Sequence, residues 1–225
     1  MLVFNRIKDN VEEIDIQHCR WIVYLCVLSM DNKTSLLEST DDQFDLIYKD
    51  EFKRFSTVHW TPIEVALLAI KWLELNEDSK VLDIGSGIGK FCTIGVLATE
   101  AHFTGVELRE SLVNEAIRVK DKLGLKDVEF LNNDIKSIDF KDYKGFYYYN
   151  PFCEYLSIEE NIDDSITFSQ ENFRQYEDYV IDQFANLSKG TKVVTYFAPH
   201  FAFPSSYELK DMFFDGTLAL WEKVF

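Results

Sequence analysis

Basic residues are scarce in this sequence, and their scarcity restricts the partners to be expected. The 23 Lys and Arg residues stand against 39 Asp and Glu residues, which gives a formal net charge of −16. Proteins bind nucleic-acid backbones largely through Lys and Arg contacts to phosphates. The densest basic group, Lys49, Lys53 and Arg54, is small. The composition therefore predicts that nucleic acid is an unlikely partner.

Cysteine pairs and long apolar runs are also missing. The four cysteines are far apart and no Cys-x-x-Cys occurs, while the four histidines show no metal-ligand spacing. We therefore expect a reduced intracellular protein without a zinc site. The apolar stretch 21–30 is too short to span a bilayer, and the acidic residues before it are wrong for a signal peptide. These absences predict a cytoplasmic protein with no membrane segment and no bound metal.

The most informative pattern lies at residues 80–90. A buried strand is indicated by Val81-Leu82 and Ile84, and an apolar, helix-permissive run follows at 91–98. Between them, glycine takes every second position of a turn: Gly85, Gly87 and Gly89. Such a turn lets the backbone approach a ligand closely, with helix N–H groups facing it. The G-x-G-x-G spacing differs from the G-x-G-x-x-G of dinucleotide folds. Because no Tyr-x-x-x-Lys pair is evident either, a nicotinamide-dependent oxidoreductase is disfavoured.

Strand-like and helix-like segments alternate over most of the chain, which predicts parallel βαβ units. Thr61-Pro62-Ile63-Glu64 is typical of a helix start with a capping box. Asp215-Gly216 separates the last two strand-like runs and predicts a hairpin. The helices expected are 61–75, 90–99, 110–123 and 170–187. The strands expected are 80–84, 103–107, 128–132, 145–149, 192–198, 207–214 and 218–225.

Residues 1–50 are expected to form a separate N-terminal helical extension on a domain of residues 51–225. Apolar residues recur there at helical spacing, at Phe4, Ile7, Val11 and Ile14. Packing on the domain is the simpler interpretation of this stripe. A substrate lid or a dimer surface is the alternative, and the oligomeric state stays open.

Four elements in order resemble the class I S-adenosylmethionine-dependent methyltransferases. They are Val81–Gly89, Gly105-Val106-Glu107, Asn133-Asp134 and Tyr149-Asn150-Pro151-Phe152, and the resemblance covers about residues 55–225. It implies an α/β fold with a doubly wound, seven-stranded, mostly parallel sheet that ends in a hairpin. It also implies S-adenosyl-L-methionine as the cofactor. The cofactor-binding residues that it implies are Asp83, Gly85, Ser86, Gly87, Gly89, Glu107, Leu108, Asp134, Ile135 and Asn150.

Three carboxylates have particular roles by this resemblance. Asp83 is expected near the methionine amino group, and Asp134 near the adenine amino group. Glu107 closes its strand, where a carboxylate can accept hydrogen bonds from both ribose hydroxyls.

Asn150-Pro151-Phe152 resembles the (Asp/Asn)-Pro-Pro-(Phe/Tyr) motif of amine methyltransferases, and these three residues are the predicted catalytic residues. In that motif the Asx carbonyl orients the acceptor nitrogen, the proline holds the backbone, and the aromatic ring favours the developing cation. This chain departs from the pattern, because Phe152 stands in place of the second proline. An Asn-centred loop also resembles the Dot1-like lysine methyltransferases.

The expected reaction is therefore methyl transfer to an amine nitrogen, on a protein lysine or a small molecule. Glu154, in an acidic loop, is a candidate for accepting the proton that the amine loses. Two alternatives stay open. One is a non-catalytic S-adenosylmethionine-binding module, and the other is an O-methyltransferase of a small molecule, which would need a base such as His200.

Overall fold

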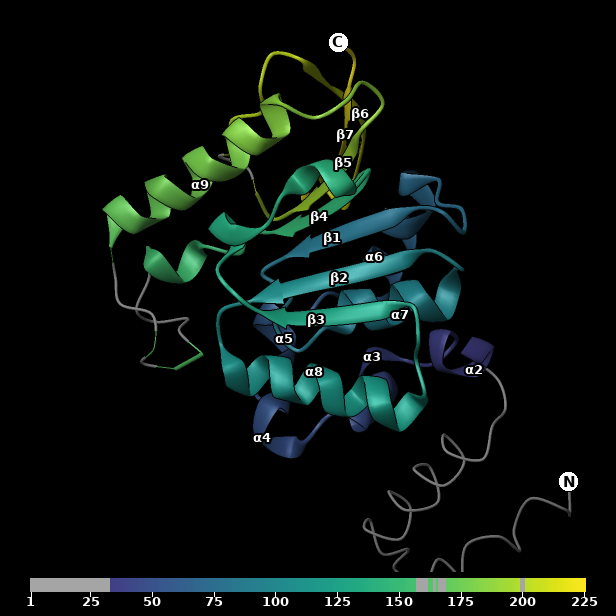
Figure 1. The fold of residues 1–225 in the computed structure, drawn as a ribbon. Helices are drawn as coiled ribbons and strands as arrows, with labels where there is room; N and C mark the ends of the chain where they lie inside the picture. Colours follow the sequence, from purple (N-terminus) through teal and green to yellow (C-terminus); the bar gives the residue numbers. More distant parts are fainter. Residues whose placement is uncertain (1–32, 157–161, 164, 166–168, 199–200) are drawn as a thin grey trace, which may run out of the picture.

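A seven-stranded sheet with helices on both faces forms the protein, as seen in a computed structural model (Figure 1). The structure describes residues 33–156, 162–163, 165, 169–198 and 201–225. The strands follow the order β3-β2-β1-β4-β5-β7-β6, in which β1 to β5 are parallel and β7 is antiparallel to both its neighbours. Their bounds are β1 Lys80–Ile84, β2 His102–Glu107, β3 Val128–Asn132, β4 Gly145–Tyr149, β5 Lys192–Tyr196, β6 Tyr207–Phe213 and β7 Leu218–Lys223. The predicted fold class, including the final hairpin, is confirmed.

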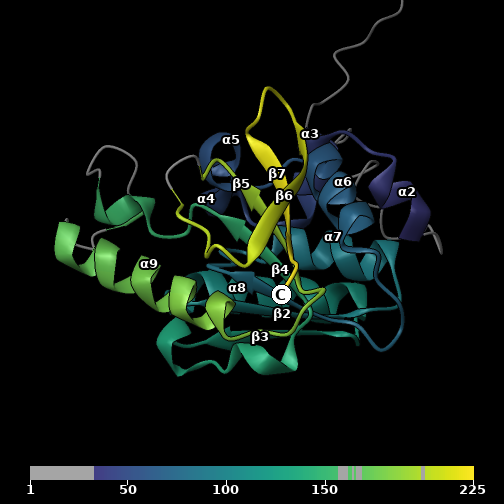
Figure 2. The same ribbon diagram turned by 90° about the horizontal axis from the view of Figure 1, so that it is seen from above.

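Helices cover the sheet in two layers, each with its own apolar core (Figures 1 and 2). One layer contains α6 Ile63–Leu73, α7 Lys90–Ala98 and α8 Glu110–Leu123. The other contains α9 Gln170–Ala185 and short turns that follow β3 and β4. Buried rings join the sheet to each layer: Tyr147 of β4 stacks on Phe91 of α7, with ring centroids 3.9 Å apart, and Phe146 packs edge-on against Phe184 of α9. Burial of such aromatic surface is a major part of the stability of the fold.

In the described residues before α6, short helices lie on the α7 side of the sheet: α2 Lys33–Leu37, α3 Asp41–Phe44, α4 Asp50–Lys53 and α5 Ser56–His59. Phe44, Ile47 and Tyr48 are buried in the same core as α6 and α7. Of the predicted N-terminal helical extension at residues 1–50, the part up to residue 32, with its apolar stripe, lies outside the described residues. The domain boundary at residue 50 stays a prediction. Within the described residues, no helix has both the length and the apolar character needed to cross a membrane.

The predicted capping box of α6 is wrong. The helix begins at Ile63, and the Pro62 N-cap provides no side-chain hydrogen bond. The Thr61 hydroxyl instead hydrogen-bonds the Tyr147 hydroxyl at 3.1 Å, and Asp41 accepts the Ile63 N–H at 3.0 Å. A residue distant in sequence therefore provides the cap, which local spacing could not reveal.

Candidate active site

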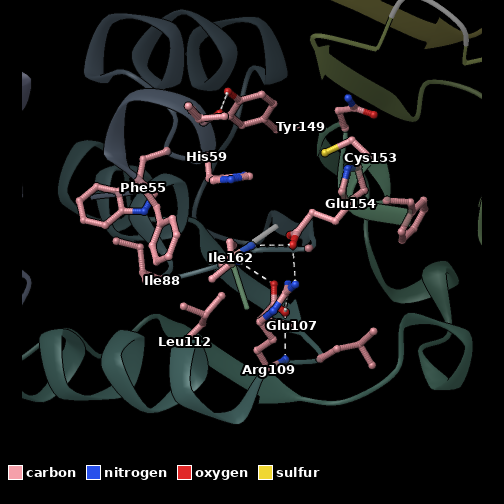
Figure 3. Close-up of a pocket in the computed structure, with 18 of the residues that line it drawn as sticks. Phe55, His59, Ile88, Glu107, Arg109, Leu112, Tyr149, Cys153, Glu154 and Ile162 are labelled. Atoms are coloured by element: carbon pink, nitrogen blue, oxygen red, sulfur yellow. Dashed lines mark hydrogen bonds and ion pairs between the residues drawn. The ribbon is translucent and has the colours of Figure 1, made fainter. Parts of the chain in front are cut away.

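A cavity of about 390 Å³ opens at the carboxyl ends of β1, β2 and β4 (Figure 3). This is the edge at which open parallel sheets bind ligands. Its walls come from the glycine turn, the ends of β2 and β4, the start of α8, α5 with its flanking residues, Tyr176 of α9 and Phe197 after β5. Of the predicted site residues, eight line it: Gly85, Gly87, Glu107, Leu108, Ile135, Asn150, Pro151 and Phe152.

The glycine turn is fixed to β2, because the N–H groups of Gly85 and Ser86 both donate to the Val106 carbonyl at 3.0 Å. Gly87 has a φ of +53°, and a Cβ placed there would meet nothing within 4 Å. Its missing side chain therefore leaves open space in the cavity wall. At Gly89, by contrast, a Cβ would lie 2.4 Å from the Phe130 ring, so this glycine is required by packing within the protein.

Glu107 is one of the carboxylates that line the cavity, with Glu154, and it is 8% exposed. Its two carboxylate oxygens accept the N–H groups of Gly87 at 3.2 Å and Arg109 at 2.9 Å. Burial raises the pKa of Glu107, while these N–H donors and the Arg109 guanidinium oppose the rise. The carboxylate is thus held at the end of β2, with its position set by the turn after β1.

Asp83, Ser86, Gly89 and Asp134 do not line the cavity. Asp83 is buried and accepts a hydrogen bond from the Cys92 thiol at 3.5 Å. Burial raises the pKa of Asp83 to about 7, with a further increase from the negative charge of Glu107. Asp134 is held beside the cavity, where it accepts from the Tyr176 hydroxyl at 3.0 Å and from the Lys136 N–H.

The turn after β4 has strained backbone. Asn150 has a φ of +37°, which is uncommon for a residue other than glycine. The backbone carbonyl of Asn150 accepts the Cys153 N–H at 3.2 Å. Phe152 is buried and stacks on Tyr176 with centroids 5.0 Å apart, so its ring belongs to the core as well as to the cavity wall. Residues in such backbone conformations persist where the surroundings hold them, and they gather at functional sites.

A buried ion cluster lies at the cavity, and sequence reasoning missed its centre, Arg109 (Figure 3). The guanidinium contacts Glu154 at 2.6 Å, Asp163 at 3.1 Å and Glu107 at 3.9 Å. Glu154 also accepts the Ile162 N–H at 2.9 Å. Glu154, the candidate proton acceptor, is therefore already bound by a cation and an N–H group. His200 lies outside the described residues.

Aromatic residues of the cavity were also missed, among them Phe55, His59, Trp60, Tyr176 and Phe197. They come from three different segments of the chain, and no spacing rule connects these segments. Cys153 lines the cavity too, three residues after Asn150. Only its position next to the Asn-Pro-Phe motif could have indicated it.

Three comparisons with known proteins concern the family and the fold. Residues 75–182 match the family model described as a methyltransferase domain. A curated relative is 31% identical over 84 residues: the 23S rRNA (uracil(1939)-C(5))-methyltransferase RlmD of Vesicomyosocius okutanii subsp. Calyptogena okutanii (strain HA). That match covers 36% of this chain and 19% of the relative. The chain therefore spans only about a fifth of the curated protein that it matches.

Solved structures share the fold. An RNA methyltransferase from Salinibacter ruber, in complex with S-adenosyl-L-homocysteine, has a TM-score of 0.51 and 21% identity, over 73% of this chain and 93% of its own. TrmN from Thermus thermophilus has a TM-score of 0.54 and 18% identity, over 77% of this chain and 52% of its own.

These relatives correct the predicted partners. The expectation that nucleic acid is unlikely, with a protein lysine or small-molecule amine as the acceptor, is wrong, because the relatives are named as RNA methyltransferases. The net charge misled because it sums over the whole surface, whereas contact with a polyanion needs only a local group of donors. The methyltransferase class and its cofactor, in contrast, are confirmed. That support comes from residues 75–182, which match the family model described as a methyltransferase domain.

Proposed function

We propose that this chain transfers a methyl group from S-adenosylmethionine to an exocyclic amino nitrogen of an RNA base. The observation that carries the proposal is Asn150, held in a left-handed conformation at the cavity wall beside Pro151. The name of the curated relative supports RNA as the substrate class. The cavity volume of about 390 Å³ is in the range of small-molecule sites.

The cavity fits the cofactor at its β1–β2 end. Gly87 leaves open space there, and Glu107 offers carboxylate oxygens that can accept from ribose hydroxyls. Leu108 and Ile135 would enclose the adenine, with Asp134 beside them. Asp83, Ser86 and Gly89 would support this end from outside the cavity, because none of them lines it.

S-adenosylmethionine supplies an activated methyl group when bound. The residues of the β4 end then position the acceptor. The Asn150 side-chain carbonyl accepts an N–H of the amino group and so directs the nitrogen toward the methyl carbon. Pro151 fixes the backbone, and Phe152 closes the wall. A nitrogen–carbon bond forms as the sulfur–carbon bond breaks, S-adenosylhomocysteine leaves, and the nitrogen releases one proton to water. Alignment contributes most of the acceleration in such a reaction.

A second candidate is transfer to a pyrimidine carbon. Cys153 lines the cavity and could act as a nucleophile on the ring, and the curated relative is named for uracil C5. Under this alternative Cys153, and not Asn150, would be indispensable.

The test is methylation of in vitro-transcribed ribosomal and transfer RNA with labelled cofactor, followed by mass spectrometry of the nucleosides. We expect an amino-methylated base. Asn150→Ala should lower the rate by about 10²–10³, the usual cost of a lost preorganised contact, while Cys153→Ser stays active. A carbon-methylated base with loss of activity in Cys153→Ser would establish the second candidate. Label in protein or small molecules, with none in RNA, would refute both.

A further inference from the structure

Arg54 is an exposed cation beside the mouth of the cavity. Its guanidinium lies 4.5 Å from the centroid of the Phe55 ring, and Phe55 lines the cavity. Its basic neighbours are engaged, because Lys53 pairs with Asp50 at 2.9 Å and Lys49 with Glu51 at 3.8 Å. In the part of the chain that the structure describes, no carboxylate pairs with Arg54. The Arg54 guanidinium can therefore donate hydrogen bonds to an anionic group of a bound partner.

Phe197 lies directly after β5 and also lines the cavity. It is 46% exposed and has a φ of +49°. Its ring centroid lies 4.6 Å from that of Tyr196 and 6.2 Å from that of Tyr149. A large apolar ring in a left-handed backbone is costly, and such outliers cluster at ligand sites. An exposed ring on this wall offers a face on which a planar group can stack.

The cavity wall that carries Phe55 and the wall that carries Phe197 are fixed relative to each other. Tyr149, at the end of β4, donates its hydroxyl to the Val58 carbonyl of α5 at 2.7 Å. His59, the next residue, points its ring into the cavity (Figure 3). We call Arg54, Phe55, His59 and Phe197 the cavity rim. It combines one cation with three rings, in a protein whose net charge is −16.

We propose that the cavity rim binds single-stranded RNA around the target nucleotide, with Arg54 on a backbone phosphate and Phe197 stacked on a base. The inference rests on the proposed function and adds how its substrate is held. Base stacking on aromatic rings together with cationic contacts to the backbone is the way proteins hold single strands. Because the protein carries a net charge of −16, a rigid duplex, which brings more phosphates close to the surface, should bind more weakly than a single strand.

The test is fluorescence anisotropy with a labelled single-stranded RNA 12-mer of mixed sequence, in the presence of S-adenosylhomocysteine. Arg54→Gln should weaken binding and make the plot of log affinity against log salt less steep by about 0.7, the value for one phosphate of a single strand. Phe197→Leu should weaken binding about 5- to 150-fold, with an unchanged salt slope. Phe197→Tyr, which keeps the ring, should bind as the parent does. The same sequence as a duplex should bind more weakly.

Two matched controls lie away from the rim. Lys126→Gln removes one positive charge before β3, and Phe225→Leu replaces an exposed ring after β7. Both should bind RNA as the parent does, and S-adenosylhomocysteine affinity should be unchanged in every variant. If RNA is methylated but the rim variants match the controls, the rim inference fails and the proposed function survives. If the parent neither binds nor methylates RNA, both fail.

Discussion

A Cβ atom on Gly85 would lie 2.4 Å from the Cβ of Pro151. The turn after β1 and the turn after β4 therefore touch where no side chain fits between them. Because Pro151 directly follows the strained Asn150, we expect this contact to couple the position of the glycine turn to that of the predicted catalytic residue.

Gly85→Ala should lower both stability and turnover. The new methyl group meets Pro151, and the φ of +74° is unfavourable for alanine. Gly124→Ala is the matched control, since Gly124 has a φ of +62° but nothing within 4 Å of its Cβ position. Backbone strain of about 1–2 kcal/mol should appear in both variants, as measured by urea unfolding. Only Gly85→Ala should lose RNA methylation, and equal activity in the two would refute the proposed coupling.

Glu107→Gln should weaken S-adenosylhomocysteine binding by about 1.5–3 kcal/mol, the range for hydrogen bonds to a charged group. Because burial raises the pKa of Glu107, acidification protonates it early and removes the charged acceptor. Affinity in the parent should therefore fall with decreasing pH, whereas Glu107→Gln should show little of this dependence. Calorimetry at several pH values tests both points. Glu129→Gln, on exposed β3 surface, is the control.

Asp83 should make the parent less stable as the pH rises toward neutral. Its folded-state pKa of about 7 lies above the ordinary 3.8, so the folded state holds a proton that the unfolded state has lost. The stabilisation is complete below the unfolded pKa and is lost as the pH rises through about 7. Asp83→Asn mimics the protonated form and should remove this loss, which is on the order of 4 kcal/mol. Urea unfolding at pH 4, 6 and 8 should show the two proteins diverging as the pH rises. Parallel curves would contradict the expectation.

Most of the fold followed from the sequence, because its elements are marked locally. The β1 and α8 bounds, 80–84 and 110–123, agree with the alternation of apolar residues and the glycines that end each run. The cap of α6 could not be predicted from the sequence, because the Ile63 N–H donates to Asp41, which is 22 residues away in the chain. Periodicity identifies which face is buried, but it does not tell which distant side chain completes a helix end.

The candidate site was predictable only where it lies on strand ends. Glu107 ends β2 and Asn150 directly follows β4, so parallel topology brings them to one edge. Arg109, Tyr176 and Phe197 come to the cavity from a helix start, a helix face and a loop. Their convergence depends on tertiary packing, and the sequence carries no local mark of it.

Lys90→Met should destabilise the protein strongly. Lys90 is 4% exposed and contacts Asp41 at 2.6 Å and Asp45 at 2.7 Å, joining α7 to the segment before α6. Its loss leaves Asp45 buried without its cation, which costs about 3–5 kcal/mol. Burial already raises the pKa of Asp45 and Lys90 opposes the rise, so acidification should partly restore the variant. Lys53→Met, which breaks the more exposed pair with Asp50, should cost about 1 kcal/mol or less. Similar unfolding free energies in the two variants would contradict a structural role for Lys90.

Glu154→Gln separates a positioning role from proton transfer. If Glu154 accepted the substrate proton, the pH–rate profile would lose its acidic limb in the variant. The structure predicts otherwise, because the carboxylate is already held by Arg109 at 2.6 Å and by the Ile162 N–H at 2.9 Å. We expect the profile to keep its shape while activity falls and the unfolding free energy drops by several kcal/mol, as when one partner of a buried pair is removed. Asp163→Asn should have a smaller effect, since that carboxylate is 43% exposed. Rates at saturating cofactor across pH 5–9 decide the matter, and a changed profile in Glu154→Gln alone would assign the proton to Glu154.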